Sequence, residues 1–256
     1  MDVTGLLDTA SEAARAVGPR LREAFRSRPP VATKRDFHDP VTEHDRAAEE
    51  TIRGVIIARW PGCAIVGEEG GVTGSGELCW YVDPIDGTAN FAAGLPFFCV
   101  SIAAAVDGEL VAGVVYDPVR EDEFTASTEG AWCNGAPIRS KGAVTDREAM
   151  LLSSYPTPLD LADDGEQALL RYGRFLESFS AVRRPGSAAL KLAHVAAGWA
   201  DAAYGTHSSP WDVAAGALLV RQAGGVYIGD PLRKGDYLAC VGGFDLRGSA
   251  LAEVAP

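Results

Sequence analysis

The chain has 256 residues, 47% of them hydrophobic and 23% charged, and its formal net charge at pH 7 is −12. This length and apolar content suffice for one large globular domain or two smaller ones. The acidic balance disfavours nonspecific binding of nucleic acid, which needs clustered lysine and arginine, and no apolar run approaches the roughly 20 residues that span a membrane. Neither nucleic acid nor a membrane is therefore expected as a partner.

The N-terminus and the cysteines indicate where the protein works. The opening segment MDVTGLLDTASEAARAVG carries acidic residues and lacks the basic and apolar regions of a secretory signal peptide. The five cysteines are scattered and form no CxxC pair, so neither a disulfide framework nor a thiolate zinc site is indicated. We therefore expect a cytoplasmic protein in a reducing environment.

Two amphipathic helices are predicted at the start of the chain. Apolar residues recur every three or four positions from Thr4 to Phe25, and Thr4 is the predicted N-cap. A second helix is predicted from Thr42 to Pro61, with Asp45 at a capping-box spacing from Thr42. The polar, proline-bearing segment RSRPPVATKRDFHDP connects the two helices.

The middle of the chain reads as β-structure. The segments CAIVGEEGG and LCWYV predict short buried strands, each followed by acidic residues. Asp107-Gly108 lies between two apolar runs and predicts a hairpin, and Asn134-Gly135 marks another turn.

Strands and helices alternate in the last part of the chain. AMLLSSY, ADAAYG, GVYIG and YLACVGG predict strands, while EQALLRYGRFLESF, GSAALKLAHVAAG and PWDVAAGALLVRQAGG predict helices. The whole pattern predicts a mixed α/β (α+β) fold. We place a boundary between an α+β subdomain of residues 1–147 and an α/β subdomain of residues 148–256.

Carboxylates stand at the ends of several predicted elements. Glu68 follows the strand AIVG, Asp83 and Asp86 follow LCWYV, and Asp45 and Asp212 lie in the first turns of helices. Taken singly, each has an ordinary explanation, because helix starts favour acids and Asp-Pro and Asp-Gly are common turn dipeptides.

Taken together, these acids suggest a metal site. Strand ends in a mixed α/β sheet meet at one edge, where ligand sites form. Carboxylates gathered there repel one another, and burying each unpaired costs several kcal/mol. A divalent cation removes this repulsion, and oxygen ligands without histidine or cysteine point to Mg²⁺.

The residues after Asp86 suggest what the metal does. Gly87 and Thr88 present backbone N–H groups at a predicted helix start, where such amides bind phosphate. A metal, a phosphate cradle and an acid that accepts a proton from water are the parts needed for phosphoester hydrolysis.

Four segments of the sequence resemble the signatures of the inositol monophosphatase family. They are GEE, WYVDPIDGTANF, GSAALKLAHVAAGWAD and PWDVAAGALLVRQAGG. KRDFHDPVTEHD is similar to the family's N-terminal K…D-x-V-T-x-x-D segment, and the matches follow in order from Lys34 to Gly225. The resemblance implies a Mg²⁺-dependent, lithium-sensitive phosphatase of small phosphate monoesters, a layered αβαβα sandwich of the sugar-phosphatase type, and a homodimer.

The resemblance also implies metal ligands. Two to three Mg²⁺ ions would be held by Glu68, Asp83, the carbonyl of Ile85, Asp86 and Asp212.

Further roles are implied for the substrate side. The amides of Gly87 and Thr88 would bind the phosphate, and Glu68 together with Thr88, backed by Asp45, would position and deprotonate the attacking water. Lys34 would lie in a mobile loop that closes over the site. The remaining implied substrate contacts are Ala89, Gly186, Ser187, Ala188, Gly205 and His207.

The match departs from the family pattern before PWD. Inositol-selective members carry a glutamate in a segment like D-A-Y-Y-E, which accepts hydrogen bonds from sugar hydroxyls. Here DAAYGTHSSPWD places Gly205 at that position, and loss of the acceptor relaxes the preference. On this interpretation, Gly205→Glu would sharpen selectivity for inositol phosphate. His207 is either a replacement contact or a surface-loop residue.

The substrate stays open at this point. Inositol-1-phosphate is the default for the family, while fructose-1,6-bisphosphate, histidinol phosphate and a broad set of sugar and polyol phosphates are alternatives. A hypothesis of another class is a catalytically idle relative that binds RNA or a protein.

Overall fold

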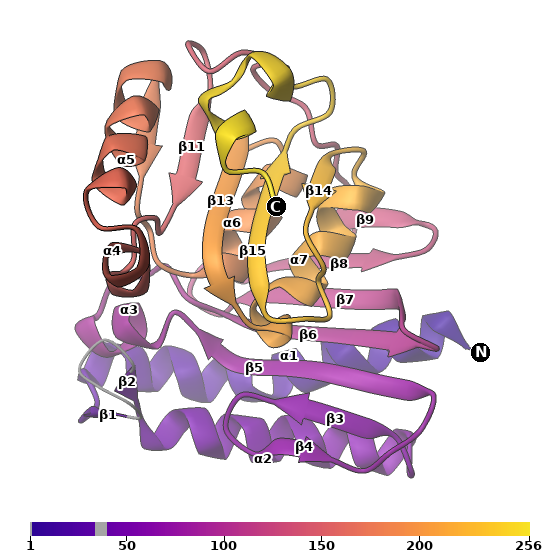
Figure 1. The fold of residues 1–256 in the computed structure, drawn as a ribbon. Helices are drawn as coiled ribbons and strands as arrows, with labels where there is room; N and C mark the ends of the chain where they lie inside the picture. Colours follow the sequence, from indigo (N-terminus) through magenta and orange to yellow (C-terminus); the bar gives the residue numbers. More distant parts are fainter. Residues whose placement is uncertain (1, 34–39) are drawn as a thin grey trace.

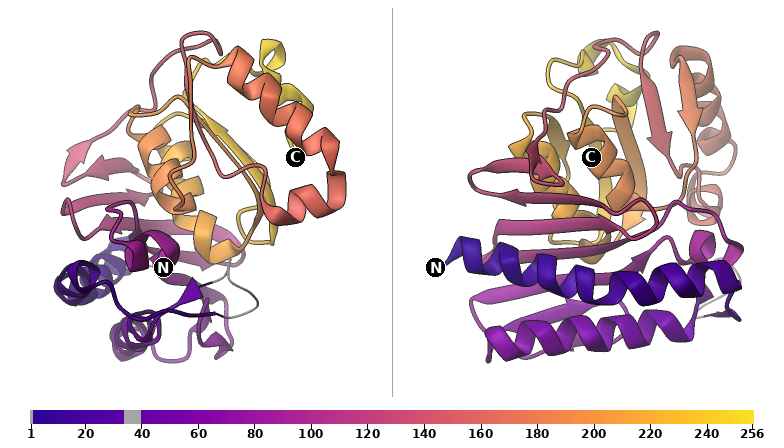
Figure 2. Two further views of the ribbon diagram at one scale, coloured as in Figure 1. Left: turned by 90° about the vertical axis from the view of Figure 1, so that its left-hand side faces the viewer. Right: turned by 180° about the vertical axis from the view of Figure 1, so that it is seen from behind.

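The computed structural model describes residues 2–33 and 40–256. Lys34, expected in a mobile loop, lies outside the described residues. Helices and sheets alternate in five layers in the order αβαβα, as the predicted fold class requires (Figures 1 and 2).

Two long helices form the first layer. These are α1 (Val3–Ser27) and α2 (Glu43–Arg59). Helix α1 is capped by Asp2, whose Oδ1 accepts from Gly5 N at 2.9 Å, so the predicted N-cap Thr4 is wrong: Thr4 already lies within the helix. Helix α2 has the predicted capping box, in which Asp45 Oδ2 accepts from Thr42 N at 2.7 Å.

The larger sheet packs against the apolar faces of α1 and α2. Among the described residues it has eight strands in the order β10-β9-β8-β7-β6-β5-β3-β4. Its strands are β3 (Ala64–Gly67), β4 (Gly71–Thr73), β5 (Leu78–Asp86), β6 (Cys99–Val106), β7 (Glu109–Asp117), β8 (Asp122–Ser127), β9 (Gly130–Cys133) and β10 (Ala136–Pro137). The predicted hairpin joins β6 to β7, and Asp107 and Gly108 both adopt the positive φ of such turns.

Helices α6 (Ala188–Ala196) and α7 (Pro210–Gln222) lie between the two sheets (Figure 2). Small residues allow this close packing. A Cβ on Gly216 of α7 would stand 2.5 Å from the Cβ of Leu192 on α6, and one on Gly113 of β7 would stand 3.1 Å from the Cα of Ala215. The alanine-rich and glycine-bearing sequences of these helices therefore suit a layer enclosed on both sides.

The smaller sheet and the outer helices complete the fold. The described strands of this sheet follow the order β12-β11-β13-β15-β14. They are β11 (Met150–Ser153), β12 (Ala181–Arg183), β13 (Ala202–Ser208), β14 (Val226–Ile228) and β15 (Gly235–Cys240), and α4 (Pro158–Asp164) and α5 (Glu166–Ser178) lie outside them. The remaining short elements are β1 (Ala32–Thr33), β2 (Pro40–Val41), α3 (Thr88–Ala93), and the 3₁₀ turns Leu246–Gly248 and Ala250–Glu253.

The predicted division at residue 147 falls between the last strand of the larger sheet and the first strand of the smaller one. That the two parts are separate subdomains stays a prediction. Within the described residues, no helix has the length and apolar character that crossing a lipid bilayer requires.

Candidate active site

The candidate site lies where two parallel strands of the larger sheet end. Strands β3 and β5 run side by side with Gly67 opposite Val82, so Glu68 and the DPID segment emerge at the same edge. The N–H of Glu68 donates to the carbonyl of Val82 at 3.2 Å. Figure 1 shows this end of β5 next to α3.

A bulge at the end of β5 brings two aspartates to the same side. Asp83 pairs with Ser101 and Asp86 with Cys99, so three steps along β5 face two along β6. In an unbroken strand, residues three apart would point to opposite faces. The extra residue removes that alternation, and the carboxylates of Asp83 and Asp86 lie within 4.8 Å of each other.

Helix α7 supplies the third aspartate. Asp212 stands in its first turn and accepts a hydrogen bond from Ser209 N at 2.6 Å. The hydroxyl of Ser101 on β6 donates to the carbonyl of Trp211 at 2.9 Å, which ties the start of α7 to the sheet. One carboxylate oxygen each of Asp83, Asp86 and Asp212 lies within 4.8 Å of the other two.

The start of helix α6 holds Asp86 in place. Asp86 Oδ2 accepts from Ser187 Oγ and from Ala189 N, both at 2.6 Å, and Oδ1 accepts from Ala188 N at 3.2 Å. Ser187 and Ala188, which the resemblance implied as substrate contacts, thus contact an acidic residue of the cluster.

The electrostatics of the cluster suit a bound cation. Burial, reinforced by Glu68, Asp86 and Asp212, raises the pKa of Asp83 well above its ordinary value. Burial also raises the pKa of Asp86 and, with repulsion from Asp86, raises the pKa of Asp212 to about 8. A divalent cation would favour the charged carboxylates, and an all-oxygen donor set fits a hard ion. The acidic cluster can therefore hold a metal.

A pocket of about 270 Å³ opens over the cluster. It brings together most of the site residues expected from the sequence. Its lining consists of Pro40, Glu68, Asp83, Ile85, Asp86, Gly87, Thr88, Ala89, Gly186 and Asp212.

Asp45 lies behind this lining and orients Thr88. The Thr88 hydroxyl lies 3.0 Å from Asp45 Oδ1 and 3.0 Å from the carbonyl oxygen of Ile85, and it can donate to either. Asp45 is fully buried and also accepts from the backbone and hydroxyl of Thr42. The φ of Gly87 is 100°, and a Cβ there would stand 3.1 Å from the carbonyl oxygen of Phe97, so glycine is needed at this turn.

Lys191 is a buried cation near the cluster that the sequence argument missed. It is 1% exposed, its Nζ donates to Ser154 Oγ at 2.9 Å, and Nζ lies 5.7 Å from the ring centroid of Tyr237. Burial lowers the pKa of Lys191 to about 8, against the attraction of Asp86 and Asp212. A lysine between leucines in the apolar helix GSAALKLAHVAAG was the available signal.

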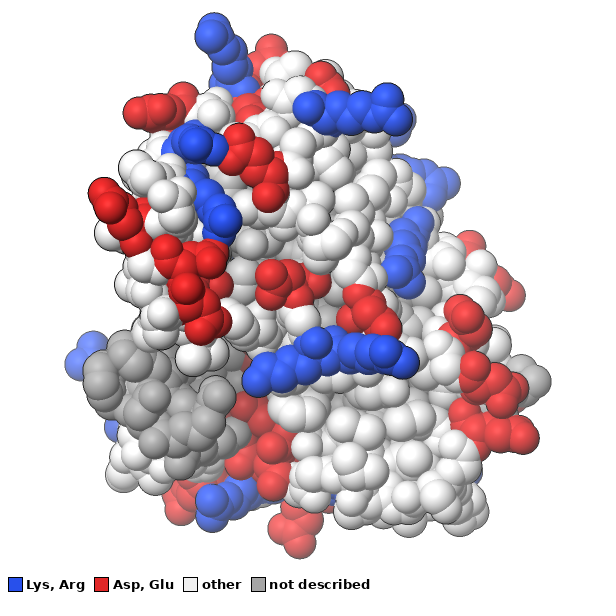
Figure 3. All heavy atoms as spheres, in the orientation of Figure 1, with Lys and Arg blue, Asp and Glu red and all other residues white. Residues whose placement is uncertain are grey.

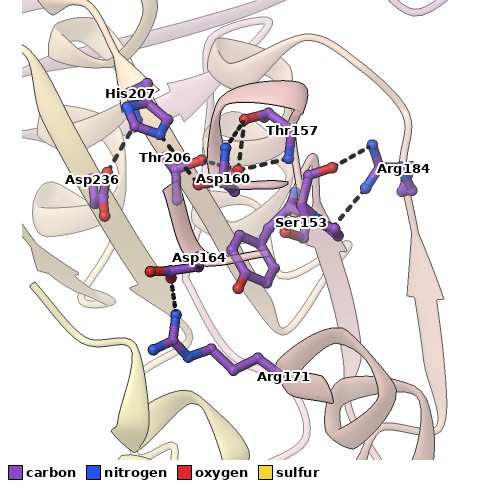
Figure 4. A network of polar contacts seen from close by, with 11 residues as sticks. Ser153, Thr157, Asp160, Asp164, Arg171, Arg184, Thr206, His207 and Asp236 are labelled. Atoms are coloured by element: carbon purple, nitrogen blue, oxygen red, sulfur yellow. Dashed lines mark hydrogen bonds and ion pairs between the residues drawn. The ribbon is translucent and has the colours of Figure 1, made fainter. Parts of the chain in front are cut away.

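Four expected substrate residues lie outside the described lining of the pocket, namely Ser187, Ala188, Gly205 and His207. His207 Nε2 lies 3.2 Å from Asp160 Oδ1, and its backbone N–H donates to Asp236 Oδ1 at 3.0 Å (Figure 4). These contacts connect the end of β13 to α4 and β15.

The chain belongs to the inositol monophosphatase family, whose model matches residues 2–243. The Nus factor SuhB of Pseudomonas aeruginosa is 42% identical over 227 residues, which cover 86% of this chain and 84% of that protein. Inositol monophosphatase 3 of Solanum lycopersicum is 38% identical over 237 residues, which cover 90% of this chain and 87% of that protein.

Solved structures with the same fold agree with this assignment. The extragenic suppressor protein SuhB from Bartonella henselae has a TM-score of 0.87 and 31% identity, covering 93% of this chain and 95% of its own. The inositol monophosphatase from Anabaena (Nostoc) has a TM-score of 0.85 and 31% identity, covering 100% of this chain and 98% of its own. The predicted fold class is confirmed, and family membership supports phosphatase activity.

Proposed function

We propose that this protein hydrolyses a small phosphate monoester in a Mg²⁺-dependent reaction. One observation carries the proposal: oxygens of Asp83, Asp86 and Asp212 converge within 4.8 Å, in a pocket that Gly87 and Thr88 also line. A purely structural site has no need for carboxylates that repel one another. Beside a glycine turn and a threonine, such carboxylates serve phosphate chemistry.

The acidic residues and one carbonyl are the proposed metal ligands. Glu68, Asp83, the carbonyl of Ile85, Asp86 and Asp212 would hold two to three Mg²⁺ ions. When bound, these ions neutralise phosphate oxygens and make water more acidic. Asp86 is presented by three donors at the start of α6, so its position is set before any ion binds.

The backbone and hydroxyl groups next to the cluster are the proposed substrate and water contacts. The amides of Gly87 and Thr88 would bind phosphate oxygens. With the proton of Thr88 Oγ1 directed to Asp45 Oδ1 or to the carbonyl of Ile85, the lone pairs of Oγ1 would accept a hydrogen bond from the attacking water. The half-buried carboxylate of Glu68 would accept the water's other proton, and direct attack by water would need no covalent enzyme intermediate.

Phosphate release by the purified protein tests the proposal. Release should require Mg²⁺, stop on chelation and return when Mg²⁺ is added back. A folded protein that releases no phosphate from any of the monoesters below, with or without Mg²⁺, would refute the proposal.

The substrate calls for a comparison within the family's range. Family membership favours inositol-1-phosphate, while Gly205 offers no side-chain acceptor for a sugar hydroxyl. Fructose-1,6-bisphosphate, histidinol phosphate and simple polyol phosphates therefore belong in the same panel, ranked by kcat/KM. Lithium inhibition can be measured on the best of them.

A second candidate function comes from the name of the relatives. Several are called Nus factor SuhB, including the one that is 42% identical, which favours a role in binding RNA or a protein. The formal net charge of −12 argues against RNA as a direct partner. On the face drawn in Figure 3, the lysine and arginine side chains are interspersed with acidic and uncharged ones. RNA gel shifts at low salt test this candidate.

The proposed assembly is a homodimer, as the family resemblance implies, and the proposed location is the cytoplasm, as the scattered cysteines suggest. Light scattering on the purified protein measures the oligomeric state directly, and fractionation of the source cells measures the location.

A further inference from the structure

Helix α2 contacts the candidate site at two points one helical turn apart. At its start, Asp45 contacts the hydroxyl of Thr88. Four residues later, Glu49 contacts the backbone directly after Glu68. Residues i and i+4 share one face of a helix, so one helix contacts both the hydroxyl of Thr88 and the turn that carries Glu68.

Glu49 bonds the turn that carries Glu68. Its Oε2 accepts from Glu69 N at 2.7 Å, and its Oε1 accepts from Gly70 N at 2.8 Å. Glu49 is 2% exposed. A buried carboxylate with several N–H partners is held far more firmly than a surface one, because each lost bond would leave charge desolvated.

Arg53 completes the arrangement from the next turn of α2. Its Nε donates to Glu49 Oε1 at 2.7 Å, its Nη2 to the carbonyl of Gly71 at 2.7 Å, and its Nη1 to Thr73 Oγ1 at 2.6 Å. The pair therefore bonds the chain from Glu69 to Thr73, with the guanidinium fixing the carboxylate in turn.

The two end residues of the segment GEEG, Gly67 and Gly70, show how closely the carboxylate of Glu49 approaches this turn. A Cβ on Gly67 would stand 2.4 Å from Glu49 Oε1, and one on Gly70 would stand 2.7 Å from the same atom. The segment GEEG thus has room for Glu49 only because both end residues lack a side chain.

The hydrogen bonds of Glu49 and Arg53 to the turn, here called the clamp, counteract an electrostatic repulsion. Glu68 and Asp83 line the same pocket, and two charged carboxylates there would repel each other. That repulsion would move a flexible turn away from the cluster before a metal binds. Hydrogen bonds to the two residues after Glu68 oppose the movement.

We propose that Glu49 is a positioning residue that fixes Glu68 against the acidic cluster, so that Glu68 is placed for metal binding and proton transfer. This inference rests on the proposed function. A residue that acts in this way through a ligand typically changes metal affinity or activity by about 10–100-fold when it is replaced.

Glu49→Gln tests the role, with Glu50→Gln as its matched control. Glu50 is the exposed next residue of the same helix, so both variants lose one negative charge. We expect Glu49→Gln to weaken Mg²⁺ binding in titration calorimetry by about 10-fold and to lower kcat by about 10–100-fold. The KM for the phosphate monoester should change less than about threefold, because Gly87 and Thr88 are untouched. A purely structural role would lower the melting temperature and leave Mg²⁺ affinity and kcat as in Glu50→Gln, and that result would overturn the proposal.

A double-mutant comparison shows whether Glu49 acts through Glu68. In a Glu68→Gln background, Glu49→Gln should cost less than about twofold further, because the residue it positions is already lost. Equal losses in both backgrounds would refute positioning of Glu68. If Glu49→Gln does not fold, Arg53→Lys keeps the charge, removes the fork and should shift Mg²⁺ affinity in the same direction; unchanged affinity would count against the clamp.

The outcomes also separate the two proposals. Wild-type protein that neither binds Mg²⁺ nor releases phosphate would refute the proposed function and this inference with it. A wild-type protein with both properties, beside a Glu49→Gln variant that keeps them, would refute the positioning role alone.

Discussion

Gly205 and Tyr237 are partners across strands β13 and β15, and the tyrosine ring occupies the space that a side chain on Gly205 would need. A Cβ on Gly205 would stand 2.5 Å from Tyr237 Cε1 and 3.0 Å from its hydroxyl oxygen. Tyr237 is 1% exposed and stacks on Tyr227 with 6.2 Å between ring centroids. The space that a side chain at position 205 would need is therefore filled by an aromatic ring.

This pairing changes what we expect of Gly205→Glu. The sequence alone suggested sharper selectivity for inositol phosphate, but the new side chain would collide with a buried ring. Overpacking of this kind costs about 1–3 kcal/mol, so we expect a melting temperature lower by several degrees and no gain in selectivity. Adding Tyr237→Ala should recover part of the loss. A single variant with unchanged melting and a raised kcat/KM for inositol-1-phosphate over glycerol phosphate would contradict this.

Replacement of Asp83 should separate catalysis from folding. Asp83→Asn removes a proposed metal ligand, so phosphate release at saturating Mg²⁺ should fall more than about 100-fold. Because burial and three neighbouring acids disfavour the charge of Asp83, the metal-free variant should melt no lower than the wild type. Malachite-green assays and circular-dichroism melts measure the two effects. Retention of most of the activity would show that Asp83 is not a metal ligand.

The stability of the metal-free protein should fall as the pH rises. Burial and Asp86 raise the pKa of Asp212 to about 8 in the folded chain, from 3.8 for the ordinary group. A carboxyl group with a raised folded pKa stabilises the fold while protonated, and this contribution is lost progressively between those two values. In EDTA, the melting temperature should therefore drop from about pH 5 to about pH 8.

Two comparisons check the origin of this pH effect. Saturating Mg²⁺ should flatten the profile, because it stabilises the charged carboxylates. Asp212→Asn should flatten it in EDTA as well, without added metal. A wild-type profile that is level in EDTA would mean that the acids are not forced together as described.

Lys191 should weaken the metal site that it accompanies. Its buried ammonium attracts Asp86 and Asp212 and so offsets part of the negative charge that a metal ion would otherwise neutralise. Lys191→Met keeps an unbranched side chain and removes this charge, and calorimetry should show Mg²⁺ binding tighter by about threefold or more. Arg184→Met, which removes an exposed positive charge, serves as the control and should change Mg²⁺ affinity less. Equal or weaker binding by Lys191→Met would disprove the effect.

Local signals foresaw much of the site because they depend on neighbours in the chain. The capping box of Thr42 and Asp45, the Asp107-Gly108 turn and the buried strands that end in acids are all short-range patterns, and the structure has each of them. The resemblance named the residues around Asp83 and Asp86 in order. The predicted N-cap of the first helix was wrong because Asp2, not Thr4, accepts a hydrogen bond from the amide of Gly5 and so caps the helix.

Contacts between distant segments were beyond the same reasoning. Lys191 lies 105 residues from Asp86 in the sequence. A separation of that length gives no sign that the two side chains are close in space, so the sequence argument missed Lys191. The sequence pattern of α2 does not single out Glu49, whose role depends on the turn after β3 packing against it.

By itself, the sequence determined the alternation of elements, the family and the acidic residues available for chemistry, since composition, periodicity and turn residues act over a few positions. Only the tertiary structure decided that a bulge turns Asp83 and Asp86 to the same side, that α6 and α7 bring Lys191 and Asp212 near them, and that Tyr237 fills the space beside Gly205. Strand register and helix packing are set by the fit of whole surfaces, which no local stretch of sequence contains.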